Sequence, residues 1–513
     1  MSSTLRSILA ALALALLCLA CSDKGEPEPP APAVDEVVPD RLSYMAPAEG
    51  GDVIVGLTAS GDWTVVHPAD VKDIHGYLAT EGGVAGRGEI RFCALPNTSG
   101  SERVTRFGIA CGRARADIEI HHPPVSIEPM SEDEVRAYLV RLYHDTDGPN
   151  WRIKNPKWLS DLPINEWGSE VHYENGLLKL YLNENNMSGT IDMSGCRALR
   201  ELRCNKSRLK AVDVSGCPNL EVLDLASNQL EKLDITGCHS LIRLNASTNP
   251  GLSDPALLRD ARMMQDADVS ACNFSSIDLS GCYSLQSLAV WRNYLTELEI
   301  PERLQLQVVW CWANRLRRLD LHDSPWLRLL NCGENDITEL NLEGCGRLGR
   351  LYCYENQLST IDLSSQKDVL GEFYCYSNRL ESLDLKDFRK LSHFHCSDNW
   401  LTSLDLTGCI CLTGFFAELN RLSELTLDPA TSLVECYLTS NRLTSIPLER
   451  CHYGSKVWVR DNPVLAEIPV AADDFLEFEH DARYEYDPVS GRVTDLKRGW
   501  WYPGEPESGA HRR

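Results

Sequence analysis

The sequence predicts a mainly β protein in which a solenoid of short stacked repeats follows a small β-sandwich. An Asn recurs every 21 residues, with one step of 22, from Asn314 to Asn441. The segment before each Asn alternates apolar and polar residues, so each unit must stack on its neighbours to bury its apolar side chains. Residues 41–125 differ, because short alternating runs are separated there by Gly, Asn and Ser turns, which is typical of a β-sandwich.

The repeat has the form Leu-x-x-(apolar)-x-(Cys or apolar)-x-x-Asn-x-(apolar) and predicts one short strand per unit. In 348–358, alternation directs Leu351 and Cys353 inward and Tyr352 and Tyr354 outward. We expect each Asn amide to turn inward and bond backbone groups that the stack leaves unpaired at the bend. A unit this short has no room for a long convex helix, so we expect a gently curved, mostly β solenoid. Fourteen units fill 177–464. We call the position of the repeated Asn in each unit its slot. The slots are Asn185, Ser207, Asn228, Asn249, Cys272, Asn293, Asn314, Asn335, Asn356, Asn378, Asn399, Asn420, Asn441 and Asn462.

These units are identified as leucine-rich repeats, and the chain resembles internalin-like and Bacteroidetes-type leucine-rich repeat surface lipoproteins. The resemblance implies a non-enzymatic role in adhesion or ligand capture. The unit between the slots Asn249 and Cys272 is longer than 21 residues, and it contains the segment Asp254 to Arg259. Asp at a cap position followed by Pro255 predicts a short helix there.

The amino terminus predicts export. Arg6 precedes the apolar run Ile8 to Ala20, which is too short to span a bilayer. The ending Leu19-Ala20-Cys21 resembles a lipobox, which implies cleavage within 1–21 and lipidation of Cys21. Residues 22–40 are expected to form a Pro-rich, disordered tether. Its acidic start is similar to the signal that directs Bacteroidetes-type lipoproteins to the outer face of the outer membrane. A plain secretory signal with an incidental Cys is the alternative.

Two further modules are expected before the repeats. Within 41–125, Gly50-Gly51, Gly61 to Val65 and Ile118 to Ile120 resemble the BACON module of exported gut Bacteroidetes proteins, for which both carbohydrate binding and a spacer role are implied. In 128–176, Ser131 and Glu134 form a capping box that opens a helix. The Trp motifs that follow it resemble the amino-terminal cap of plant-type and bacterial repeat proteins, so this segment is expected to cover one end of the solenoid. A second cap is expected over 465–504, with a frayed tail over 505–513.

The 50 basic and 74 acidic residues give a net charge of −24, which argues against nucleic acid and anionic lipid as partners.

Most of the 20 Cys fall in two columns of the repeats, one at an inward position of the strand and one at a position after the second turn. We favour buried free thiols over a ladder of disulfides, because parallel side chains fit disulfide geometry poorly. Cys93 and Cys111 are open to either state.

No motif for catalysis, phosphate binding or metal ligation is present, so we predict no enzyme activity, no cofactor and no metal site. The outward strand residues carry the functional signal, because stacking aligns them into columns. The first column lies between the two inward strand positions, and the second column lies two residues later. Aromatic residues concentrate in the second half of both columns. The predicted binding residues are Trp291, Trp310, Trp312, Tyr352, Tyr354, Tyr374, Tyr376, His395, Phe416, Tyr437 and Trp458. The earlier first-column residues are Arg203, Asp224, Asn245, Asp268 and Ala289.

Three hypotheses follow for these aromatic columns. An exposed aromatic surface suits a protein or peptide partner, which is the leading hypothesis. It also suits sugar rings, so glycan capture in a nutrient-uptake system is the rival. In the third, the rings only shield one another along the strands, and the solenoid is a spacer without a ligand. Contact with a membrane is expected only through the lipid anchor.

Overall fold

The computed structural model describes residues 35–66, 76–78, 80, 82–97, 99–125, 129–301, 305–445 and 450–462, together with three short strands within 475–493. The chain divides into two units between Val125 and Ser126, and each unit has a hydrophobic core of its own. The predicted export signal with Cys21, the first part of the tether and the tail lie outside the described residues, as does most of the predicted cap 465–504.

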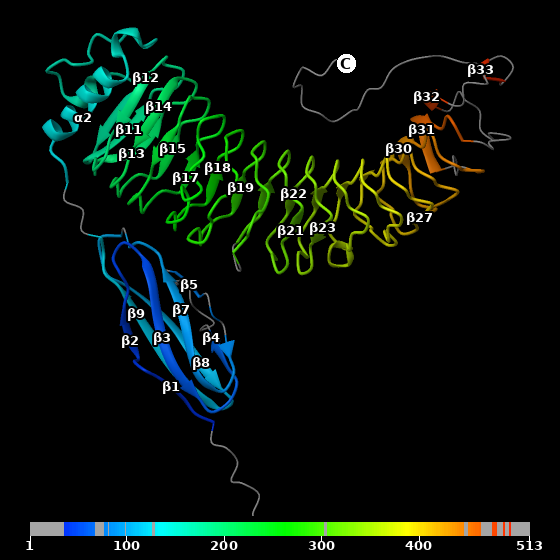
Figure 1. Cartoon of the computed structure of the whole chain (residues 1–513), viewed down its shortest axis with the longest axis horizontal. Helices are drawn as coiled ribbons and strands as arrows, with labels where there is room; N and C mark the ends of the chain where they lie inside the picture. Colours follow the sequence, from blue (N-terminus) through cyan, green and yellow to red (C-terminus); the bar gives the residue numbers. More distant parts are fainter. Residues whose placement is uncertain are drawn as a thin grey trace, which may run out of the picture. The chain divides into compact units, whose positions relative to one another are not determined.

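The first unit consists of two sheets that enclose one core (Figure 1). Val53, Val55 and Leu57 on β3 are buried, whereas the residues between them face outward, as period-two alternation requires. The sheet orders are β1-β3-β7-β5 and β2-β9-β8-β4-β6. Cys93 and Cys111 are buried, and neither forms a disulfide within the described residues. The strands are β1 (Val37–Pro39), β2 (Ser43–Met45), β3 (Gly51–Ala59), β4 (Trp63–Val66), β5 (Gly76–Leu78), β6 (Gly82–Gly83), β7 (Gly86–Ala94), β8 (Arg103–Cys111) and β9 (Ala114–His122).

The second unit begins with the helix α2 (Glu132–Asp145). Its capping box is formed, because Ser131 Oγ accepts from the Glu134 backbone N–H at 3.3 Å and Glu134 Oε2 accepts from the Ser131 backbone N–H at 2.7 Å. The apolar face of α2 joins the same core as the repeats. Buried Trp151, Trp158 and Trp167 pack against one another beside it. This segment also contains the 3-10 turns η1 (Gly148–Asn150) and η2 (Ile164–Glu166) and the strand β10 (Val171–Glu174).

The predicted solenoid is confirmed as a long, mostly parallel sheet. Each of the fourteen slots follows one strand of this sheet, and equivalent residues of neighbouring strands pair in register, as Leu330 does with Leu351. β10 pairs antiparallel at one end and β32 (Phe475–Glu479) pairs at the other. The strands between them are β11 (Leu177–Tyr181), β13 (Leu199–Arg203), β15 (Val222–Asp224), β17 (Arg243–Asn245), β18 (Asp266–Asp268), β19 (Ser287–Ala289), β20 (Val308–Trp310), β22 (Leu329–Asn331), β24 (Arg350–Tyr352), β25 (Glu372–Tyr374), β26 (His393–His395), β28 (Gly414–Phe416), β30 (Leu433–Tyr437) and β31 (Cys451–Trp458).

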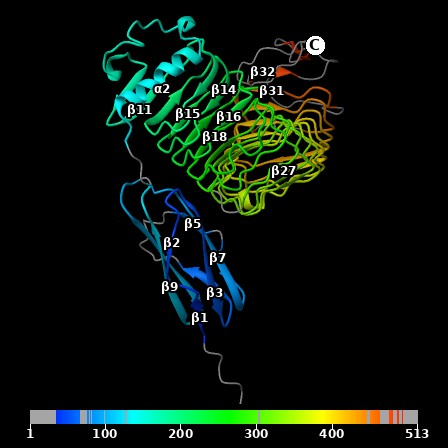
Figure 2. The same ribbon diagram turned by 60° about the vertical axis from the view of Figure 1, so that its left-hand side comes forward.

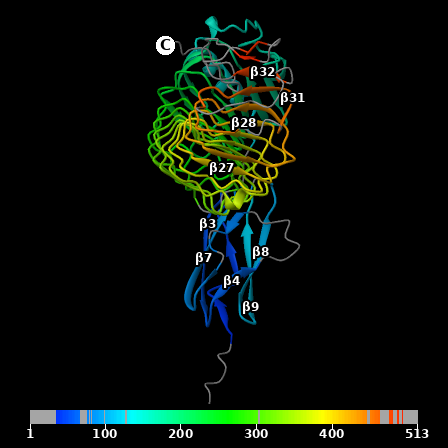
Figure 3. The ribbon, with the colours of Figure 1, turned by 90° about the vertical axis from the view of Figure 1, so that its right-hand side faces the viewer.

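The second half of each unit forms turns and short strands on the opposite side of the stack. In Figure 1, β22, β30 and β31 lie on the inner side of the curve, whereas β21, β23 and β27 lie on its outer side. Figures 2 and 3 show the same units stacked behind one another in turned views. We call the inner surface the concave face. The remaining elements are β12 (Ser188–Asp192), β14 (Arg208–Asp213), β16 (Lys232–Asp234), β21 (Arg318–Asp320), β23 (Glu339–Asn341), the 3-10 turn η3 (Ser364–Gln366), β27 (Ser403–Leu406), β29 (Glu424–Leu427), β33 (Tyr486–Asp487) and β34 (Arg492–Val493).

The repeated Asn satisfies backbone groups at the bend after each strand, as predicted. Asn356 Nδ2 donates to the carbonyl oxygens of Cys332, Cys353 and Tyr354 at 3.0–3.2 Å, and its Oδ1 accepts from the Ile337 N–H at 2.9 Å. The residue before each slot has a left-handed backbone, for example Glu355 with φ of 48°. This conformation costs non-Gly residues free energy, so the hydrogen bonds of the buried Asn side chain must hold the turn in place.

The buried thiols at the position after the second turn also form hydrogen bonds. Cys345 Sγ donates to the Leu321 carbonyl at 3.1 Å, and Cys409 Sγ donates to the Leu385 carbonyl at 3.2 Å. A small apolar side chain with one weak donor therefore suits this position. The Cys residues of the described part of the repeats are free thiols.

The predicted helix from Asp254 to Arg259 is wrong. Leu257 N–H donates to the Asp254 carbonyl at 3.2 Å and Arg259 N–H to the Ala256 carbonyl at 3.1 Å, so the segment is a series of turns. Asp254 Oδ1 accepts the Ala256 N–H, as the N-cap pattern predicts, but the bonds that follow span three residues instead of four. In the part of the chain that the structure describes, no helix is both long and apolar enough to cross a membrane.

Candidate functional site

The structure places the predicted binding residues on the concave face of the solenoid. First-column residues such as Tyr374 lie on the strands of the long sheet, and second-column residues such as Tyr376 follow directly after them. Because neighbouring strands pair in register, equivalent side chains stand next to one another across the sheet.

Six rings of the first column form an unbroken row, which we call the aromatic ladder. Ring centroids of neighbours in this row are 4.6–6.0 Å apart, within the range of favourable aromatic contacts. The row crosses six consecutive strands, β24 to β31. The aromatic ladder consists of Tyr352, Tyr374, His395, Phe416, Tyr437 and Trp458.

The second column adds two stacked pairs. Trp291 and Trp312 lie 5.0 Å apart with their rings 6° from parallel, and Tyr354 and Tyr376 lie 4.8 Å apart at the same angle. Gly333 separates the pairs in the column. A Cβ at Gly333 would lie 2.5 Å from Tyr354 Cζ, so the Tyr354 ring covers this position. The absence of a side chain at Gly333 therefore leaves room for the Tyr354 ring.

The rings are partly exposed, with one exception. Tyr437 lies in the first column, but its exposed fraction is only 5 %, because the rings of Phe416 and Trp458 flank it. It does not belong to the hydrophobic core of the solenoid, where Phe394 instead stacks between two other phenylalanines. Mutual shielding of the rings is therefore real, yet the row still presents an aromatic surface to solvent.

Burial shifts the pKa of three groups on this face. Burial lowers the pKa of His395 to about 4, so its imidazole is neutral at neutral pH. Burial raises the pKa of Glu418 to about 7, and Ser397 Oγ donates a hydrogen bond to its carboxylate. Tyr352 Oη donates to Glu372 Oε2, and burial, which is the larger cause, together with this bond raises the pKa of Tyr352. Glu418 follows Ser397 in the second column, and sequence reasoning did not assign it.

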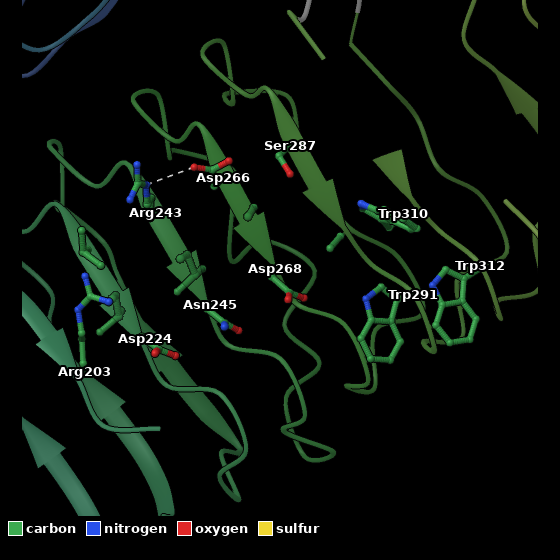
Figure 4. Close-up of a pocket in the computed structure, with 15 residues that line it drawn as sticks. Arg203, Asp224, Arg243, Asn245, Asp266, Asp268, Ser287, Trp291, Trp310 and Trp312 are labelled. Atoms are coloured by element: carbon green, nitrogen blue, oxygen red, sulfur yellow. Dashed lines mark ion pairs between the residues drawn. The ribbon is translucent and has the colours of Figure 1, made fainter. Parts of the chain in front are cut away.

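A hollow with a volume of about 600 Å³ opens on the concave face before the aromatic ladder (Figure 4). Trp291, Trp310 and Trp312 stand at one end, and a row of polar side chains leads up to them. Sequence reasoning assigned the three Trp to the site but not these polar residues. The sequence did contain a signal for them, because the first column changes from polar and small residues to large rings. The polar residues lining the hollow are Arg203, Asp224, Arg243, Asn245, Asp266, Asp268 and Ser287.

Each Arg of the hollow has an acidic neighbour. Arg243 Nε lies 3.3 Å from Asp266 Oδ2, and Arg203 Nη2 lies 3.2 Å from Glu201 Oε2. No ion pair involves Asp224 or Asp268 within the described residues. The hollow therefore carries excess negative charge next to a wall of indole rings. Among those same described residues, no group of three or more His, Cys, Asp or Glu side chains is placed to hold a metal ion.

The chain is similar to several solved structures of leucine-rich repeat proteins. No family model and no curated protein matches the chain. Among solved structures, the functional domain of InlJ from Listeria monocytogenes, described as including a cysteine ladder, is 26% identical, with a TM-score of 0.47 over 58% of this chain and 72% of that one. The internalin InlF from the same organism is 18% identical, with a TM-score of 0.43 over 52% and 82%. YopM, a leucine-rich effector protein from Yersinia pestis, is 19% identical, with a TM-score of 0.47 over 69% and 100%. The stacked parallel strands make the second unit a mainly β solenoid, and the solved structures similar to it are leucine-rich repeat proteins of the internalin and YopM types.

Proposed function

We propose that this protein recognises a protein or peptide ligand through the concave face of its solenoid and has no enzymatic activity. The observation that carries the proposal is the aromatic ladder, a partly exposed row of rings on six consecutive strands. Aromatic side chains supply most of the binding energy at many protein interfaces, because they bury a large area at a small cost in side-chain entropy.

The scaffold favours binding without rearrangement. The strands that carry the ladder are fixed by parallel pairing on both sides, and the buried Asn amides fix the turns after them. A row of rings held in place loses little conformational freedom when a ligand docks, so more of the contact energy appears as affinity. An aromatic surface that only shielded itself would not need to lie on the concave side, where a partner is surrounded on several sides.

The proposal also includes location. We infer that the chain is exported and held by a lipid on Cys21 at the outer face of the outer membrane, with the tether and the BACON-like module as spacers. Replacing Cys21 by Ser should release the protein from the membrane fraction into the soluble fraction, which immunoblotting of fractionated cells would detect. A variant that stays with the membrane would contradict the anchor.

The ligand class is tested on three supports with the soluble fragment 35–513, which keeps the strand β1 of the first unit. Protein and peptide arrays are expected to retain the fragment, whereas a glycan array is not. Retention by glycans alone would replace the proposal with glycan capture. Retention by none of the three would favour a spacer without a ligand.

Removing rings from the concave face should weaken ligand binding at least about tenfold, a loss of roughly 1.4 kcal/mol or more. The test variant combines Trp310→Ala, Tyr352→Ala and Tyr374→Ala, and affinity is measured by calorimetry for the ligand that the arrays identify. The matched control removes Tyr294, Trp326 and Trp400, which lie outside both columns and are 40–46% exposed. The control should bind normally. Equal affinity of the test variant, with its circular dichroism spectrum unchanged, would remove the concave site.

A further inference from the structure

The hollow before the aromatic ladder has a defined slot at its aromatic end. In the first column, Asp268, Ala289 and Trp310 belong to the neighbouring strands β18, β19 and β20. Adjacent strands lie about 4.8 Å apart, so the space above Ala289, between Asp268 and Trp310, is about 10 Å wide from strand to strand. This width admits one flat group between the carboxylate and the indole. Trp291, which follows Ala289 by two residues, closes the slot on another side (Figure 4).

Asp268 has bonding capacity left for a ligand. Its Oδ1 accepts the Ser270 N–H at 3.0 Å, and among the described residues its Oδ2 has neither a hydrogen bond nor an ion pair. Asn245 and Asp224 continue the row, and each uses its Oδ1 for the same kind of turn. Ser270 beside them is buried, and its Oγ has no partner within the described chain. An unpaired carboxylate oxygen facing a hollow favours a cationic donor over a neutral one.

The rings of the wall already accept a guanidinium from the protein itself. Arg292 Cζ lies 4.9 Å from the ring centroid of Trp312 and 5.8 Å from that of Trp291. These are distances at which a cation is attracted by an aromatic ring. A guanidinium is planar, stacks on aromatic rings and matches a carboxylate with two parallel N–H donors, whereas an ammonium offers a point charge without a flat face.

We propose that this hollow binds an arginine side chain of the protein partner, with the guanidinium between Asp268 and the indole wall. The inference rests on the proposed function, because it assigns a chemical class to one part of the ligand that the concave face recognises. Charge supports it in two ways. The hollow has two carboxylates without ion-pair partners in the described structure, and the whole chain has a net charge of −24 that attracts a basic segment.

The test uses the full chain and N-acetyl-arginine amide as the probe, with calorimetry as the measurement. N-acetyl-citrulline amide has the same shape without the charge and should bind at least about tenfold more weakly. Asp268→Asn should weaken arginine binding by a similar factor, because the amide can keep the bond to Ser270 but loses the charge. Asp384→Asn is the matched control, since Asp384 Oδ1 accepts the Lys386 N–H at 3.3 Å in the same kind of turn outside the hollow. This control should bind like the parent.

Three outcomes would overturn the inference: no saturable binding of the arginine probe, equal binding of citrulline, or unchanged binding by Asp268→Asn. Preferential binding of a methyl glycoside in the hollow would overturn it as well. The result is separable from that of the aromatic ladder. A partner that needs the ladder but is indifferent to Asp268 would refute only the arginine assignment, whereas arginine binding without any protein partner would refute the proposed function and leave only the preference of the hollow for a guanidinium.

Discussion

Replacing Asn399 by Ala is expected to lower the free energy of unfolding of the solenoid by about 3 kcal/mol or more. Asn399 Nδ2 donates to the carbonyl oxygens of Cys375, Cys396 and Ser397 at 2.9–3.3 Å, and its Oδ1 accepts the Leu380 N–H at 2.9 Å. The side chain is buried, so water cannot replace these bonds. The substitution leaves several backbone groups unpaired and removes the support of the strained turn at Asp398, whose φ is 54°.

Urea unfolding followed by circular dichroism, with the thiols kept reduced, measures this change. Asn273→Ala is the matched control, because Asn273 is exposed and lies one residue after a slot that Cys272 fills. Its effect should stay within about 0.5 kcal/mol, as for most surface substitutions. If both variants lost the same stability, the buried amides would not be what holds the turns.

The second large effect concerns Glu418, whose replacement by Gln should stabilise the protein by about 3 kcal/mol at pH 8 and by almost nothing at pH 4. Burial raises the pKa of Glu418 to about 7 from an ordinary value of 4.5. The folded state therefore holds the proton more tightly than the unfolded chain. Stability is greatest below pH 4.5, declines as the pH rises through 7, and bears the full cost of the buried charge above that.

The measurement is the difference in unfolding free energy between variant and parent across pH 4 to 8. His395 titrates in the opposite sense. Its pKa is lowered to about 4, so its contribution is lost as the pH falls from its ordinary value of 6.5. Because both proteins contain His395, the difference isolates Glu418. Gln can still accept the Ser397 hydrogen bond, so packing changes little. A difference that does not vary with pH would show that Glu418 is ionised at little cost in the folded protein.

The register of the solenoid could be predicted because two independent features of each unit indicate it. The Asn slot and the alternation before it both indicate which strand residues face inward, and Leu351 and Cys353 are indeed buried whereas Tyr352 is only partly so. A one-residue error would have moved every side chain to the opposite face. The position of the aromatic columns on one shared face followed from that register.

The turns and the polar part of the site could not be predicted in the same way. Left-handed backbone usually indicates Gly, but the residue before the slot is Glu355 in one unit, Ser377 in the next and Leu419 further on, so composition gives no signal. The hollow depends on which charges pair with each other across strands, as Arg243 does with Asp266. Residue spacing does not determine these pairings. The burial of Glu418 is likewise not determined by residue spacing.

The uniform pairing of the strands has a consequence for how such a chain changes through duplication. Removing or copying one whole period, for example 379–399, would join Asn378 to a segment that ends in the same turn and meets the same kind of neighbour. The hydrogen bonds of the flanking rungs would be re-formed by equivalent atoms. Genetic gain or loss of single periods can therefore lengthen or shorten the binding surface by about 4.8 Å at a time without requiring new packing solutions. Gain or loss of part of a period would instead move the residues of every later unit out of register with their neighbours.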